Sequence, residues 1–364
     1  MSALLENKRN QIIAFVALGI FLLILPFLAG MIGQAWVRIL NITLLYVMLA
    51  LGLNVVVGVA GLLDLGYVAF YAVGAYTWAL LASNHFDLSY PFWVLLPLGA
   101  FLAALAGLML GAPVLKLRGD YLAIVTLGFG EIIRILMNNL DKVSLPGSDT
   151  VYNLTNGPRG VTGIDGLNFF GFKVRQGIEV FGHQVTGLQL YYFVFLAIAI
   201  LSVWMVYNLQ HSRLGRAWQA LREDEIAAKA MGINVRNVKL AAFAFGALTG
   251  GLAGGLFAAM QGFVSPESFG LLESVMILAM VVLGGMGHIP GVILGAVLLA
   301  AMPEVIRYVA DENVQQKVFG LVVIAPEVLR NLIFSLAMIL IMLYRPRGLW
   351  PSPDRKADTG GSAK

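Results

Sequence analysis

The chain has 364 residues, of which 59% are hydrophobic and 12% charged, with no cysteine and a formal net charge of +4. Soluble domains carry about 25% charged and about 45–50% apolar residues, so the composition excludes an ordinary soluble protein. The missing cysteines exclude disulfides and thiolate metal sites. Apolar runs long enough to cross a membrane recur throughout. Together these features predict an all-α polytopic membrane protein.

About ten membrane spans are predicted in chain order. They cover roughly residues 11–31, 36–58, 65–83, 92–113, 120–138, 189–209, 239–261, 271–287, 290–308 and 328–344. The first is interpreted as a retained helix, because its apolar run is longer than the h-region of a signal peptide. The spans define a transmembrane permease domain over residues 1–350. The tail over residues 351–364 has a composition that predicts disorder.

The basic residues indicate the orientation of the chain. Most of them gather in segments that an even number of spans places on one side, namely 1–10, 114–119, 210–238 and 345–364; the short segments 59–64 and 288–289 fall on the same side. The positive-inside rule makes that side cytoplasmic, so both termini are predicted to be cytoplasmic. Residues 139–188 then form an external loop, with a strand expected over 167–174. A loop of this length is usually functional or mobile.

Residues 216–233 are predicted to form one charged amphipathic helix in the cytoplasmic segment. Ser212 is a suitable N-cap and Gly232 a suitable left-handed stop. Glu225 and Lys229 stand at the favourable i,i+4 spacing. An apolar stripe follows the helical period through Leu214, Ala217, Trp218, Leu221, Ala228 and Met231. Two interpretations remain open: a solvated loop whose arginines set topology, or a docking helix that lodges in a cleft of a cytoplasmic partner.

Several motifs resemble those of the branched-chain amino-acid ABC importer permeases. They lie at residues 215–228 with 231–233, 53–76, 117–134, 261–269, 282–287 and 345–349. Within that family the chain is most similar to the M-type permease. It departs from the common pattern at Asp64, where many members have a small or apolar residue, and over residues 156–160 in the external loop.

The resemblance implies the ABC importer permease fold, with a probable inverted repeat, in the inner membrane of a bacterial cell. It implies as partners a homologous H-type permease, two ABC ATPase subunits and a periplasmic or lipid-anchored substrate-binding protein. The expected substrates are leucine, isoleucine and valine, with urea or short amides as the alternative. The helix over 216–233 would be the coupling helix. Its expected ATPase-coupling residues are Arg216, Ala217, Leu221, Arg222, Glu223, Asp224, Glu225 and Gly232.

The sequence contains no Gly-x-x-x-x-Gly-Lys-Ser/Thr motif, which a nucleotide-binding P-loop needs. We therefore expect no cofactor and no enzymatic activity in this chain, with ATP bound by partner subunits; nucleic acid is not an expected partner. An ion-coupled secondary transporter is the alternative class. It would place ionisable or unwound-backbone sites at the midplane, whereas this chain has few carboxylates within its spans.

Charged residues beside the membrane are the remaining candidates. Glu131 and Arg134 stand at i,i+3 near the outer end of a predicted span, and Glu273 begins another. Each is interpreted either as a local ion-pairing group or as part of the outer face or pathway, meeting the binding protein or a zwitterionic substrate. Arg38 is expected to extend to the outer interface. Glycines predict close helix packing, with gating hinges as the alternative: Gly128, Gly130, Gly246, Gly250, Gly251, Gly254 and Gly255.

Overall fold

The structure is a computed structural model. It describes residues 8–83, 90–114, 117, 119–144, 151–169, 172–180 and 183–309, with isolated positions between 328 and 350. The predicted tail over 351–364, and most of the predicted span over 328–344, lie outside the described residues.

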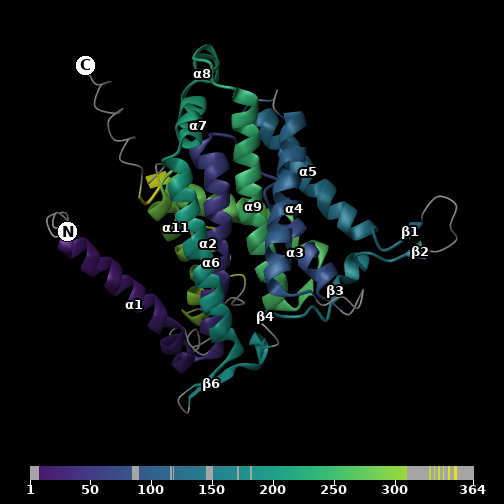
Figure 1. Ribbon diagram of the computed structural model, residues 1–364, viewed down its shortest axis with the longest axis vertical. Coiled ribbons are helices and arrows are strands. Elements are labelled where there is room, and N and C mark those ends of the chain that lie inside the picture. Colours follow the sequence, from purple (N-terminus) through teal and green to yellow (C-terminus); the bar gives the residue numbers. More distant parts are fainter. Residues whose placement is uncertain are drawn as a thin grey trace.

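Helices form the body of the molecule (Figure 1). They are α1 (Lys8–Ile32), α2 (Gln34–Leu53), α3 (Val68–Leu81), α4 (Phe92–Val114), α5 (Asp120–Asn139), α6 (Gly187–Gln210), α7 (Arg213–Glu223), α8 (Glu225–Ala230), α9 (Val235–Gln261), α10 (Leu271–Gly284) and α11 (Ile289–Val309). A π-helix over Asn54–Val59 continues α2. The predicted all-α class is confirmed.

Four of the described helices are long and apolar enough to cross a membrane. They are Gln34–Val59, Phe92–Val114, Gly187–Gln210 and Val235–Gln261, and shorter apolar helices cover Val16–Ile32, Val68–Leu81, Leu271–Gly284 and Ile289–Pro303. The predicted spans 65–83 and 271–287 correspond to α3 and α10, which have 14 residues each. A helix of that length covers about 21 Å, less than the hydrocarbon core of about 30 Å.

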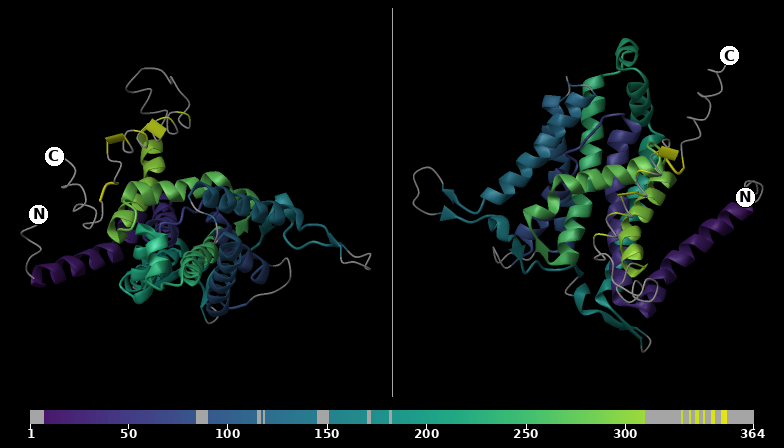
Figure 2. Two further views of the ribbon diagram at one scale, coloured as in Figure 1. Left: turned by 90° about the horizontal axis from the view of Figure 1, so that it is seen from above. Right: turned by 180° about the vertical axis from the view of Figure 1, so that it is seen from behind.

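The first helix differs from the others in its surroundings. It extends away from the main bundle, which both views in Figure 2 make plain. Many of its apolar side chains are exposed, from Ile13 at 58% to Met31 at 84%, although its second half is joined to α6, where the Tyr192 hydroxyl donates to the Leu22 carbonyl. An aliphatic surface of this kind is stable only against lipid or another apolar protein surface, which agrees with a membrane location.

The segment 60–67 explains why α3 is short. It is not helical, and it packs against α5, where the Leu65 N–H donates to Thr126 Oγ1 at 3.0 Å. Asp64 is 1% exposed, and its Oδ1 accepts from the Gly66 N–H at 2.9 Å. The side chain of Asp64 is thus buried inside the bundle, and the cytoplasmic location of the linker over 59–64 stays a prediction.

The centre of the bundle consists of α9 packed against α3 and α4. Glycine makes this approach close: a Cβ on Gly251 would lie 2.7 Å from the Gly99 carbonyl oxygen of α4. A Cβ on Gly254 would lie 2.7 Å from the Ala75 nitrogen of α3. The packing interpretation of the α9 glycines is confirmed. Gly128 differs, because a Cβ there would meet nothing within 4 Å.

Short antiparallel strand pairs lie at one end of the bundle. They are β1 (Val143–Ser144) with β2 (Val151–Tyr152), β3 (Val161–Thr162) with β8 (Phe263–Val264), β4 (Asn168–Phe169) with β5 (Phe172–Lys173), and β6 (Ile178–Val180) with β7 (His183–Val185). The β4–β5 pair replaces the single strand predicted over 167–174, because the chain reverses within that range. The β3–β8 pair joins the long loop to the segment after α9.

Candidate functional site

The two ends of the bundle carry different features. We call the end with α7 and α8 the α7 end, and the end with the β-strand pairs the hairpin end; they lie on opposite sides in Figure 1. The residues predicted for ATPase coupling are at the α7 end. The polar groups predicted for the other face are distributed toward the hairpin end.

The predicted single helix over 216–233 is wrong, because the structure divides it at Asp224. That residue is extended, with φ −155° and ψ 112°, and separates α7 from α8. Its Oδ1 accepts from the N–H groups of Ile226 and Ala227 at 2.7 and 3.1 Å. An aspartate side chain that bonds nearby backbone N–H groups favours a helix start over a helix interior. The acidic run is thus the beginning of a second helix.

Both predicted helix-end signals are confirmed. Ser212 Oγ accepts from the Gly215 N–H at 3.3 Å at the start of α7. Gly232 has φ +83° after α8. Its N–H donates to the Lys229 carbonyl and the next N–H, of Ile233, donates to Ala228, which is the Schellman arrangement.

The apolar stripe of α7 faces the helical bundle of the same chain. Trp218 is 0% exposed, and its Nε1–H donates to the Val238 carbonyl of α9 at 2.7 Å. Leu221 is also buried, at 6%. On the neighbouring α8, Glu225 Oε1 accepts from Lys239 Nζ of α9 at 2.9 Å, a partner that helical spacing did not predict. Both short helices are therefore attached to the first turns of α9.

Arg222 connects α7 to a junction of backbone turns at the α7 end. Its Nη1 donates to the Gly58 carbonyl in the π-helix that ends α2. In the same place the Gly287 N–H, from the α10–α11 turn, donates to Asn54 Oδ1 at 2.8 Å. A Cβ on Gly287 would lie 3.1 Å from the Gly58 carbonyl oxygen. Arg222 thus contacts the element that precedes α3 and lies next to the turn that follows α10.

The exposed face of α7 and α8 consists of other residues. Arg216, Glu223 and Asp224 are exposed, whereas Ala217 and Arg222 are half-buried. Ile226 and Met231 are apolar and yet 68% and 83% exposed. Neither residue belongs to the predicted coupling set. They add apolar surface beside the charged residues, and a docking role for this face stays a prediction.

The polar candidates elsewhere have separate partners. Glu131 forms an ion pair with Arg134 on α5, with Arg134 Nε 3.0 Å from Glu131 Oε2. Glu273 lies beside the Tyr46 hydroxyl at the start of α10. The adjacent Ser274 Oγ accepts from the Val68 N–H at 3.2 Å, which joins the first turns of α10 and α3. The ion-pair interpretation holds for Glu131 and Arg134, while a pathway role for all three stays a prediction.

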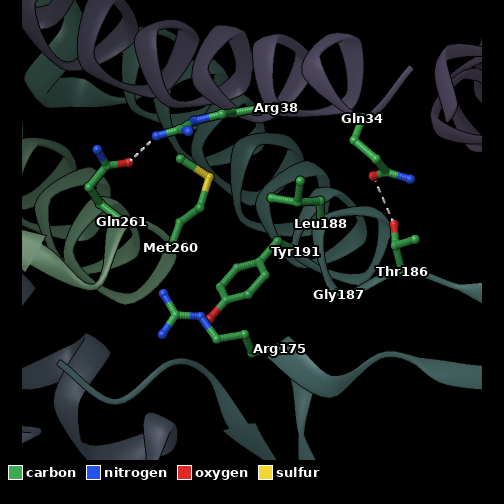
Figure 3. Close-up of a pocket in the computed structure, with 9 residues that line it drawn as sticks. All are labelled: Gln34, Arg38, Arg175, Thr186, Gly187, Leu188, Tyr191, Met260 and Gln261. Carbon is green, nitrogen blue, oxygen red and sulfur yellow. Dashed lines mark hydrogen bonds between the residues drawn. The ribbon is translucent and has the colours of Figure 1, made fainter. Parts of the chain in front are cut away.

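A pocket of about 500 Å³ opens at the hairpin end (Figure 3). It lies between the first turns of α2 and α6, the last turn of α9 and the loop that carries Arg175. Arg38 Nη2 donates to Gln261 Oε1 across it at 2.7 Å. Tyr191 forms part of the floor, and its hydroxyl donates to the Ala259 carbonyl at 3.0 Å. Sequence reasoning noticed Arg38 but not Arg175, because no local pattern brings these two residues together.

The geometry suits attachment and movement of helices more than chemistry. Among the residues that the structure describes, no group of three or more His, Asp or Glu side chains is placed to hold a metal ion. The α7 end offers an exposed helix pair anchored to α2 and α9. The hairpin end offers a pocket with two arginines.

Comparison with known proteins decides the family. The profile of the family described as branched-chain amino acid transport system / permease component matches residues 35–343. The chain belongs to that family. The permease is 42% identical over 368 residues to the high-affinity branched-chain amino acid transport system permease protein LivM of Escherichia coli (strain K12), covering 97% of this chain and 78% of that relative.

Two further relatives show how wide the family is. The probable branched-chain amino acid transport permease protein LivM of Methanocaldococcus jannaschii is 27% identical over 315 residues, covering 82% of this chain and 84% of the relative. LivH of Escherichia coli (strain K12), also named as a high-affinity branched-chain amino acid transport permease, is 25% identical over 324 residues, covering 85% and 92%. No solved structure matches the permease significantly. The described helices and the family together make it a multi-pass membrane protein.

Proposed function

We propose that this permease is the M-type membrane subunit of an ATP-driven importer for leucine, isoleucine and valine. The observation that carries the proposal is the anchored helix pair at the α7 end. Trp218 and the Glu225–Lys239 ion pair hold α7 and α8 to α9, while Ile226 and Met231 face outward. Such an element transmits force from a bound partner to the helices behind it.

The partners follow from the same arrangement. Two ABC ATPase subunits dock on the α7 end and bind the ATP, which this chain has no P-loop to bind. A homologous H-type permease forms the other half of the membrane unit, and the likeness to LivH-named relatives supports such a pair. A substrate-binding protein delivers the amino acid at the hairpin end. We propose that the permease lies in the inner membrane of a bacterial cell, with the α7 end and both termini on the cytoplasmic side.

The route of coupling within the permease is a further part of the proposal. Closure of the ATPases displaces α7, and Arg222 passes that displacement to the Gly58 backbone at the end of α2. The Asn54–Gly287 bond carries it to the α10–α11 turn. The two short helices α3 and α10, which meet through Val68 and Ser274, then move relative to the long spans.

Reconstitution tests the function directly. The permease, its H-type partner, the ATPases and the binding protein are placed in vesicles, and uptake of radiolabelled leucine, isoleucine and valine is measured with and without ATP. We expect uptake that requires ATP and both soluble components. Uptake driven by a Na⁺ or H⁺ gradient without the ATPases would overturn the proposal. If urea or short amides compete for uptake and leucine does not, the proposed substrates are wrong and urea or short amides take their place.

A further inference from the structure

The pocket at the hairpin end has the charge of an anion receptor. Arg38 and Arg175 both reach it, both are exposed, and the residues that line it include no aspartate or glutamate. The first turns of α2 and α6 also border it, and helix N-termini add partial positive charge. The carboxyl end of α9 offsets part of this effect. The net environment favours one negatively charged group.

The two arginines are held differently, and both are available to a stronger acceptor. Arg38 donates at 2.7 Å to the Gln261 side chain, a neutral amide. Arg175 packs against the backbone at Gly262. This glycine has a φ of +71°, and a Cβ added to it would lie 2.6 Å from Arg175 Nη2. A charge-assisted bond to a carboxylate is roughly twice as strong as a bond to a neutral acceptor. A carboxylate would therefore displace Gln261 from Arg38, and Figure 3 shows the Arg175 guanidinium on the other side of the same pocket, with Met260 between the two arginines.

The surface beside the pocket extends the positive region. Arg175 also lines a second hollow of about 580 Å³, together with Lys173, Tyr90 and Trp93. Asp165 is the one carboxylate among the described residues of that lining, so the two cations outnumber it and the hollow stays positive on balance. Aromatic and arginine side chains of this kind are enriched where proteins bind one another. Two adjacent hollows on one face suit a broad protein partner better than a single small molecule.

We propose that the pocket between α2, α6 and α9 receives a carboxylate side chain of the substrate-binding protein, with Arg38 and Arg175 as the recognising residues. This inference rests on the proposed function and names the contact by which its soluble partner is oriented. A free amino acid is the poorer occupant, because the lining carries no carboxylate to balance the ammonium group. Release of Gln261 from Arg38 would accompany docking.

The test uses the complete transporter in nanodiscs and the substrate-binding protein that supports its uptake. Arg38→Gln and Arg175→Gln are compared with Arg159→Gln, an exposed arginine of the same loop outside the pocket. We expect each pocket variant to weaken affinity for the binding protein about tenfold and to reduce the salt dependence of binding. Arg159→Gln should match wild type. Uptake at saturating binding protein should be unchanged in all three.

The outcomes separate the two proposals. If wild type shows no ATP-dependent uptake, the proposed function fails. If wild type transports but both pocket variants bind the binding protein as it does, the pocket inference alone is wrong. Reduced uptake of free leucine without any change in binding-protein affinity would also overturn the inference, because it would make the pocket a substrate site. Unchanged thermal unfolding of the variants controls for misfolding.

Discussion

At the α7 end, charged and aromatic groups are held by buried anchors, whereas at the hairpin end Arg38 and Arg175 are exposed. Trp218 is 0% and Lys239 3% exposed, and each bonds another element at 2.7 and 2.9 Å. Arg38 is exposed and donates to the neutral side-chain amide of Gln261. A rigid attachment transmits displacement, while an open, charged surface recognises a partner that must leave again. The buried groups of the α7 end therefore serve attachment, whereas the exposed arginines of the hairpin end serve recognition.

Among the substitutions that test this difference between the two ends, Trp218→Ala should have the largest effect on stability and uptake. Removing a fully buried tryptophan leaves a cavity and costs about 3–5 kcal/mol, and the Val238 carbonyl also loses its donor. We expect a large fall in thermal unfolding temperature and loss of uptake. Trp204→Ala is the matched control, because Trp204 is 63% exposed. Equal effects of the two substitutions would show that α7 is not anchored through Trp218.

Glu225→Ala comes next. It leaves the buried Lys239 ammonium without this partner, and a buried charged group that loses its bond costs about 2 kcal/mol. The double variant Glu225→Ala with Lys239→Met removes both charges and should recover most of that loss. Denaturant unfolding of the wild type, the two single variants and the double variant measures the interaction energy between Glu225 and Lys239. Additive effects would indicate that the 2.9 Å contact contributes no interaction energy.

Arg222→Gln should change coupling more than stability. The shorter side chain cannot keep the bond to the Gly58 carbonyl, so ATPase closure would be less well transmitted to α2. We expect uptake to fall roughly tenfold, the size of effect seen for residues that link coupled sites. ATPase recruitment and basal ATP hydrolysis should stay near wild type. Arg216→Gln, on the exposed face, is the control, and it should weaken recruitment instead.

Asp224→Ala should have a modest effect on α8. It removes the N-cap that accepts from Ile226 and Ala227, and loss of such a cap costs about 1 kcal/mol. Hydrogen exchange of the α8 amides should rise, with little change in α9. Asp224→Asn, which keeps the capping oxygen, should behave as wild type. If the two variants are alike, charge matters at this position and capping does not.

The smallest effect is expected at the hairpin end. Arg38→Gln and Arg175→Gln should each change the free energy of unfolding by less than about 0.5 kcal/mol, as exposed substitutions usually do. A stability loss comparable to that of Glu225→Ala would remove the contrast between the two ends, because it would make these arginines structural. Thermal unfolding in the same nanodiscs provides the measurement.

Several features of the site could be predicted from neighbouring residues in the chain. Ser212 and Gly232 were found as helix-end signals because capping depends on residues a few positions apart. The break at Asp224 was missed, although three consecutive acidic residues favour a helix start. The stripe containing Trp218 and Leu221 was found, but the partner it faces was not. Helical periodicity shows that one face is apolar and leaves open whether the same chain or another protein covers it.

The sequence alone determined the membrane class, the family and the helix-end signals at Ser212 and Gly232, because composition, motif spacing and capping are properties of short stretches of chain. The tertiary structure decided which groups meet across long separations. Arg222 reaches Gly58 across 164 residues, and Arg38 reaches Gln261 across 223. It also decided that 60–67 enters the bundle as a non-helical segment. Contacts of this kind depend on how helices pack, which no local periodicity encodes.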